Sequence, residues 1–138
     1  MPESSKHLEL VQRILAYIRS NFAGIQQVAV LHDLPGFVGC DKPPKVGAFR
    51  PDVYAIDAPV TRTVIGEAKT IADLETDHSR EQFEAFLGYL RLQRNPTLIT
   101  SVPWQAKATA RSLLQTLCGR LDAGAVRVVV IDDVEIFN

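Results

Sequence analysis

Two carboxylates and one lysine near the middle of the chain have the residue types and spacing for metal-dependent hydrolysis. Asp52 opens one apolar run, and after fourteen intervening residues Glu67 and Lys69 close a second. Strand periodicity places Glu67 and Lys69 on one face. If the runs pair as an antiparallel hairpin turning at residues 57–59, Asp52 lies close to Glu67. The sequence therefore predicts two carboxylates and an ammonium group at one edge of a small sheet, as a divalent-metal hydrolase requires.

These residues carry a family resemblance. Pro51-Asp52 followed by Glu67-Ala68-Lys69 is similar to the PD-(D/E)XK motif of the restriction-endonuclease-like nuclease superfamily. The resemblance implies a nuclease that hydrolyses phosphodiester bonds in DNA with Mg²⁺ or Mn²⁺. It implies that Asp52, Glu67 and the backbone carbonyl of Ala68 hold the metal and that Lys69 orients the attacking water. The alternative for the Glu67–Lys69 pair is a solvated strand-edge ion pair worth about 0–1 kcal/mol.

The elements around the motif predict an α/β fold. Apolar spacing predicts helices over residues 7–22, 79–90 and 104–121, strands over 27–31, 97–102 and 125–131, and the hairpin over 50–70. Gly66, facing away from the site, leaves room for a helix to pack closely. Trp104 is expected to be a packing residue, and residues 71–77 a polar connection. The order resembles the α-β-β-β-α-β core of the restriction-endonuclease-like fold, a mixed sheet flanked by helices, from about Leu8 to Ile131.

Two helical residues are further candidates for the site. In the superfamily an acidic residue on the first helix often completes the metal site, and Glu9 has that position here. Its alternative role is an ion pair with Arg13, four residues on. Gln82 matches a glutamine that the superfamily often places on the helix after the E-x-K strand, and its alternative role is a capping box with Ser79. Tyr89 departs from the spacing of the tyrosine that commonly follows this glutamine.

A loop rich in glycine and proline precedes the motif. Residues 36–49 include Lys42 and Lys45, and Arg50 follows directly before Pro51 and Asp52. Cations at these positions could hold phosphates of DNA without reading its sequence. A solvated loop with incidental lysines explains the same residues equally well.

Composition narrows the class of protein. The 138 residues with a formal net charge of −1 predict one domain, residues 1–138, and weigh against a protein that coats nucleic acid with its whole surface. No membrane span or signal peptide is visible, so a cytoplasmic location is expected. Cys40 and Cys118 are isolated, which predicts reduced thiols and no zinc site.

Two functions of different classes follow. The first is a Mg²⁺-dependent deoxyribonuclease, for which a cut through both DNA strands would require a homodimer. The second is a catalytically inactive nuclease-like module that binds nucleic acid or a protein partner. The near-neutral charge favours the module, and the presence of Asp52, Glu67 and Lys69 together favours the enzyme.

Overall fold

The computed structural model describes residues 4–22, 28–36, 41–57 and 59–136, which form an α/β structure around a mixed sheet. The five strands lie in the order in which they occur in the sequence. They are β1 (Ala29–His32), β2 (Val53–Ile56), β3 (Thr63–Ala68), β4 (Pro96–Val102) and β5 (Arg127–Asp132). The strand β2 is antiparallel to its neighbours β1 and β3, and β3, β4 and β5 run parallel. The predicted α/β class, the hairpin and the mixed sheet are confirmed.

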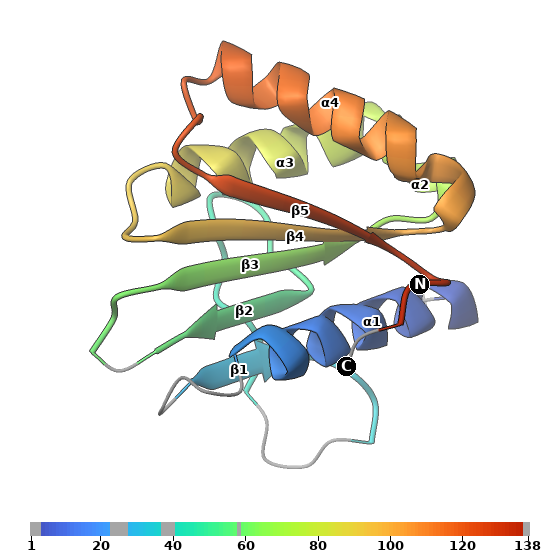
Figure 1. Cartoon of the computed structure of the whole chain (residues 1–138), viewed down its shortest axis with the longest axis horizontal. Coiled ribbons are helices and arrows are strands. Elements are labelled where there is room, and N and C mark those ends of the chain that lie inside the picture. The colour runs from blue at the N-terminus through green and yellow to red at the C-terminus, as the bar shows by residue number, and fades with distance from the viewer. Residues whose placement is uncertain (1–3, 23–27, 37–40, 58, 137–138) are drawn as a thin grey trace.

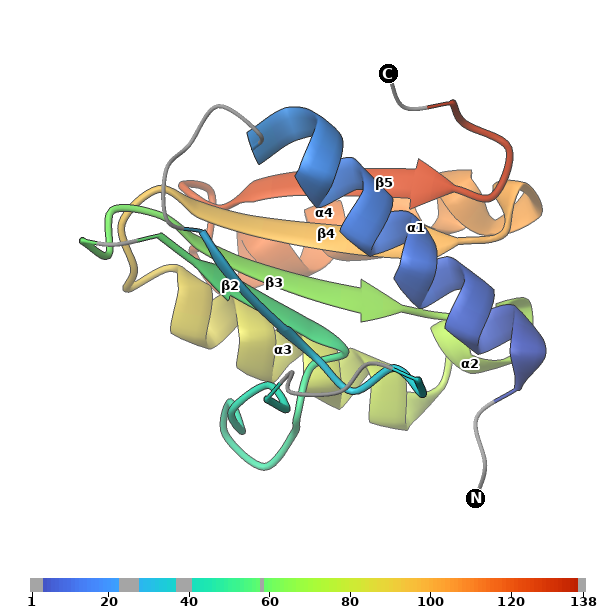
Figure 2. The ribbon, with the colours of Figure 1, turned by 90° about the horizontal axis from the view of Figure 1, so that it is seen from below.

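Helices cover both faces of the sheet (Figure 1). The helix α1 (Ser5–Phe22) crosses one face, as the view from below shows most clearly (Figure 2). The helices α3 (Asp77–Leu90) and α4 (Lys107–Arg120) cover the other face. Each face has its own apolar core, one built on α1 and one on α3 and α4. No helix within the described ranges is long and apolar enough to cross a lipid bilayer.

The close packing of α1 on β3 depends on Gly66. A Cβ atom at this position would lie 2.7 Å from Cγ2 of Ile14 and 3.1 Å from Cβ of Val53. Contacts this short leave no space for a side chain, so α1 approaches the strand only because residue 66 is glycine. The predicted close approach of a helix to this face is confirmed.

The segment between β3 and α3 differs from the prediction. Residues Ile71–Leu74 form a short helix, α2, where a polar connection was predicted. The helix α3 begins at Asp77 with Thr76 as its N-cap, because the Thr76 hydroxyl accepts the Ser79 N–H at 3.1 Å. The Ser79 hydroxyl instead donates to the Asp73 carbonyl at 2.6 Å. The predicted capping box of Ser79 with Gln82 is therefore wrong, and the Gln82 side chain is released for another contact.

One feature of the C-terminal half, the exposure of Trp104, also differs from expectation. Trp104 begins a 3₁₀ turn, η1 (Trp104–Ala106), and is 56% exposed, so its expected packing role is wrong. A hydrogen bond from the backbone to a side chain holds this turn, because the Trp104 N–H donates to Asp133 Oδ1 at 2.9 Å. The strand β5 lies at the sheet edge and contributes to both cores, with Val130 buried on the side of α3 and α4 and Ile131 on the side of α1.

Candidate active site

The register of the hairpin places Asp52 opposite Glu67. Val53 pairs with Gly66, so the next pair outward along the same register is Asp52 with Glu67. Residues opposite each other in an antiparallel pair share a face, with Cβ atoms about 4.5–5.5 Å apart. The Asp52 N–H donates to Glu67 Oε1 at 3.1 Å, and the Ala68 N–H donates to Asp52 Oδ2 at 2.9 Å. The structure thus brings the two carboxylates together, and the strand backbone holds both.

Lys69 is held against the same pair. Its N–H donates to the carbonyl of Ser101 on β4 at 3.0 Å, which extends the β3–β4 pairing by one residue. Its ammonium group lies 3.4 Å from Glu67 Oε2 and donates to Oε1 of Gln82. The ring of Phe83, 5.9 Å away, faces the same nitrogen atom. Only 6% of Lys69 is exposed, so its side chain is buried and these contacts hold its ammonium group in place.

The two carboxyl groups differ in their affinity for a proton. Burial and the neighbouring Asp52 carboxylate raise the pKa of Glu67 well above its ordinary value. Burial opposes ionisation of Asp52 as well, but hydrogen bonds from His7 and from the Ala68 N–H outweigh it, and the pKa of Asp52 is lowered. Of the two acids, Glu67 is therefore the one that binds a proton more readily. Neighbouring acids with divergent pKa values are a common feature of catalytic sites.

The first helix contacts the site through His7. Nε2 of His7 donates to Asp52 Oδ1 at 3.2 Å. Glu9, predicted as a metal ligand, has a 54% exposed side chain and forms an ion pair with Lys6 at 3.6 Å. Sequence reasoning missed His7 because it sought an acidic residue, and because the contact across 45 residues depends on how α1 crosses the sheet. The only signal for this contact in the sequence was the presence of a histidine near the start of the predicted helix.

The candidate catalytic residues line a cleft of about 630 Å³. Its walls come from the start of α1, the loop before β2, the end of β3, and the α2–α3 region. This volume is within the range of small-molecule sites, about 300–1,000 Å³. His78 also lines the cleft and was missed from the sequence. His78 lies four residues before Gln82, which places both side chains on one face of α3. This spacing was the signal in the sequence that could have identified His78 as a site residue.

The three predicted nucleic-acid contacts lie in different surroundings. Arg50 is exposed and lines the cleft next to Asp52. Lys42 lies 3.9 Å from the carboxylate of Asp33 at the rim of a smaller neighbouring hollow. Lys45 is exposed in the loop. Of these three cations, Arg50 is the one in direct reach of a substrate in the cleft.

Tyr89 joins α3 to the sheet. Its hydroxyl shares a hydrogen bond of 2.7 Å with the hydroxyl of Tyr54 on β2. Burial and this hydrogen bond raise the pKa of Tyr54 above its ordinary value, so Tyr54 remains protonated at neutral pH. Tyr89 therefore stabilises the packing of α3 rather than contributing a group to the cleft.

The oxygen donors at the site fit a hard divalent cation. No group of three or more His, Cys, Asp or Glu side chains suited to a metal occurs within residues 4–22, 28–36, 41–57 and 59–136. The backbone carbonyl of Ala68, which lies between Glu67 and Lys69 in the sequence, would be the third oxygen. Mg²⁺ commonly binds through one or two carboxylates and keeps several waters.

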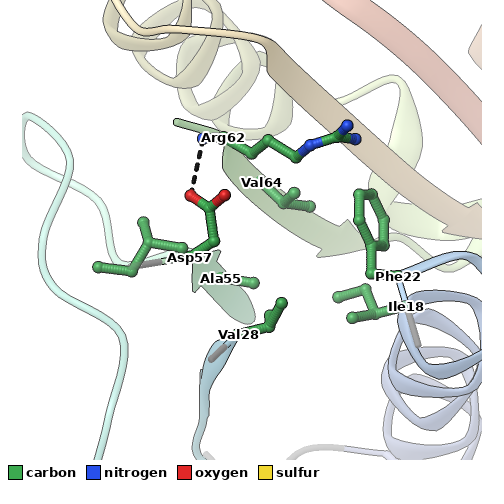
Figure 3. Close-up of a pocket in the computed structure, with 8 residues that line it drawn as sticks. Ile18, Phe22, Val28, Ala55, Asp57, Arg62 and Val64 are labelled. Carbon is green, nitrogen blue, oxygen red and sulfur yellow. Dashed lines mark hydrogen bonds between the residues drawn. The ribbon is translucent and has the colours of Figure 1, made fainter. Parts of the chain in front are cut away.

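A second hollow, beyond the other end of β2, has no comparable chemistry (Figure 3). Its walls are mainly apolar: Ile18, Phe22, Val28, Ala55 and Val64. Asp57 at its edge is occupied by the hairpin turn, because its Oδ1 accepts the N–H groups of Thr61 at 2.7 Å and Arg62 at 2.9 Å. The cleft beside Asp52 is therefore the stronger candidate for function.

Comparison of the chain with protein-family models, curated proteins and solved structures gives no match.

Proposed function

We propose that the protein is a metal-dependent nuclease with a restriction-endonuclease-like core, which hydrolyses phosphodiester bonds in DNA with Mg²⁺ or Mn²⁺. The proposal rests on Asp52 lying opposite Glu67, with the Lys69 ammonium 3.4 Å from Glu67 Oε2, at an open cleft. The order α1-β1-β2-β3-α3-β4 supports the core, since it follows the α-β-β-β-α-β pattern of that superfamily, interrupted only by the short α2.

Each residue of the site has a separate role in this proposal. Asp52, Glu67 and the carbonyl of Ala68 would hold the cation. A bound divalent cation neutralises charge on the phosphate and lowers the pKa of a water. Lys69 orients the attacking water through its ammonium group, which Gln82 and Glu67 hold in place. His7 orients Asp52 through its 3.2 Å hydrogen bond.

The proposal is tested by cleavage of linear and branched DNA with and without Mg²⁺ or Mn²⁺. The wild type is expected to cut only with metal. Lys69→Ala is expected to bind DNA as the wild type does but to cleave it about 10²–10⁴-fold more slowly, because the water loses its orienting cation. Arg94→Ala removes an exposed cation elsewhere and serves as the control. Cleavage by Lys69→Ala at the wild-type rate would place the activity at another site or in a contaminant.

One observation favours a second candidate, an inactive nuclease-like module that binds nucleic acid or a protein partner. The carboxylates already receive hydrogen bonds from their own chain: Asp52 from His7 and the Ala68 N–H, and Glu67 from the Asp52 N–H. Both carboxyl groups in such a site have hydrogen-bond partners without a cation. DNA binding with no cleavage under any metal, and no change in thermal stability with metal, would support the module.

A nuclease that cuts both DNA strands would in addition behave as a homodimer in solution.

A further inference from the structure

We propose that Arg50 and His78 together hold a phosphate next to the scissile bond of the bound nucleic-acid strand. This inference rests on the proposed function, because it assigns the substrate contact of the same cleft. Both side chains are exposed and both line the cleft. They come from two elements, the loop before β2 and the first turns of α3, which meet at one side of it.

The position of His78 follows from the helix that presents it. His78 lies four residues before Gln82, so the two side chains are neighbours on one face of α3, about one helical turn apart. Gln82 holds the Lys69 ammonium at the inner end of this face. His78 therefore lies about one turn farther out, where the strand that leaves the catalytic residues would pass.

A packed turn fixes the loop that carries Arg50, beside His78. The Val46 N–H donates to the Phe49 carbonyl at 2.6 Å, and the Phe49 N–H donates to the Val46 carbonyl at 3.2 Å. Gly47 has φ +63° and lies so near α3 that a Cβ atom would be 3.5 Å from Cβ of Ala85. The ring of Phe49 meets the His78 ring edge-on, with centroids 5.5 Å apart. Because Arg50 follows Phe49 directly, this ring contact fixes the backbone of Arg50 relative to His78.

The charges around the two residues suit an anion. No ion pair of Arg50 occurs with any residue that the structure describes. The acids nearest in sequence to His78 have other partners, since Asp77 pairs with Arg80 at 3.3 Å and Asp73 accepts the Thr70 hydroxyl at 2.9 Å. A guanidinium and an imidazole N–H both donate to phosphate oxygens, and such contacts position a strand without reading its bases.

The test measures binding of a labelled oligonucleotide, single-stranded and duplex, in EDTA over a range of salt concentrations. Each phosphate contact contributes about −0.9 to the slope of log K against log salt for duplex DNA, and about −0.7 for a single strand. Arg50→Gln is expected to make the slope shallower by about that amount and to weaken binding about three- to tenfold. His78→Ala removes a hydrogen-bond donor and is expected to weaken binding about three- to tenfold. His78→Lys should restore the affinity that His78→Ala loses, which a merely structural role would not do.

Arg94→Gln is the matched control, because it removes an exposed cation from the far end of the sheet, where its neighbour Asn95 bonds the hairpin turn at the Thr61 carbonyl. It should leave slope and affinity unchanged. A wild-type slope in Arg50→Gln together with wild-type affinity in His78→Ala, or no binding of DNA or RNA by the wild type, would overturn the inference. The binding assay requires no hydrolysis. A slope change without cleavage would refute the nuclease and keep the phosphate contact, and cleavage with unchanged slopes would refute the contact alone.

Discussion

Asp52 and Glu67 are each hydrogen-bonded to the backbone of the other's strand. Glu67 Oε1 accepts the Asp52 N–H at 3.1 Å, and Asp52 Oδ2 accepts the N–H of Ala68, the residue after Glu67, at 2.9 Å. The separation of the two carboxylates is therefore set by the β2–β3 register and not by a loop. Sites built on rigid elements hold reacting groups more accurately than sites built on loops.

The buried acid Glu67 is expected to cost stability in the absence of a cation. Burial and Asp52 raise the pKa of Glu67 above its ordinary value of 4.5, so the wild type loses stability as the pH rises through the folded-state pKa. Glu67→Gln removes this loss and should raise the free energy of unfolding by roughly 0.5–2 kcal/mol at pH 8. The gain should shrink at pH 4–5, where the wild-type side chain is neutral. Urea unfolding in EDTA at both pH values measures it.

Glu81→Gln is the control for this experiment, since Glu81 is exposed on α3. It should change stability by less than about 0.5 kcal/mol at either pH. An identical gain for Glu67→Gln at pH 4.5 and at pH 8 would mean that Glu67 ionises as an ordinary glutamate.

Mg²⁺ should stabilise the wild type through Asp52. A ligand that binds only the folded state at one hundred times its Kd adds about 2.7 kcal/mol to the free energy of unfolding. Asp52→Asn should lose this response in thermal melts across a Mg²⁺ series. Glu9→Gln should keep it, because the Glu9 carboxylate pairs with Lys6 at 3.6 Å and is largely exposed. Loss of the Mg²⁺ response in Glu9→Gln would show that Glu9 contributes to the metal site.

Gln82→Ala should slow cleavage without weakening DNA binding. The Gln82 side chain accepts a hydrogen bond from the Lys69 ammonium, so its removal leaves that group free to turn toward Glu67 alone. Supporting residues of this kind typically change activity about 10–100-fold. Single-turnover cleavage and equilibrium binding together measure the effect. Equal losses in binding and in cleavage rate would show that Gln82 touches substrate instead of positioning Lys69.

Gly66→Ala should destabilise the protein by about 1–3 kcal/mol, because the new methyl group would lie 2.7 Å from Ile14 Cγ2. Gly88→Ala is the matched control: it lies within α3 with no atom within 4 Å of the added Cβ, and should stabilise by about 0.5–1 kcal/mol. In an Ile14→Ala background the further cost of Gly66→Ala should decrease. Denaturant unfolding measures all four variants, and an undiminished cost would place the clash elsewhere.

Local patterns in the sequence predicted most of the elements. Alternating apolar residues predicted β2 and β3, and the turn residues around Asp57 predicted their antiparallel pairing, which the structure confirms. The hairpin also predicted the approach of Asp52 to Glu67, because register is set by neighbours along the two strands. The predictions failed where one local signal competed with another. Ser79 has a capping pattern, but Thr76, three residues earlier, caps α3.

The sequence by itself predicted the candidate residues for chemistry and determined the hairpin that joins Asp52 to Glu67 and the α/β order of the elements. Only the tertiary structure decided that His7 and not Glu9 contacts Asp52, that Gln82 bonds Lys69, and that His78 lines the same cleft. The physical reason is distance along the chain. Strand pairing follows from periodicity within a few residues, whereas contacts between α1, α3 and β3 depend on crossing angles that the packing of both cores sets together.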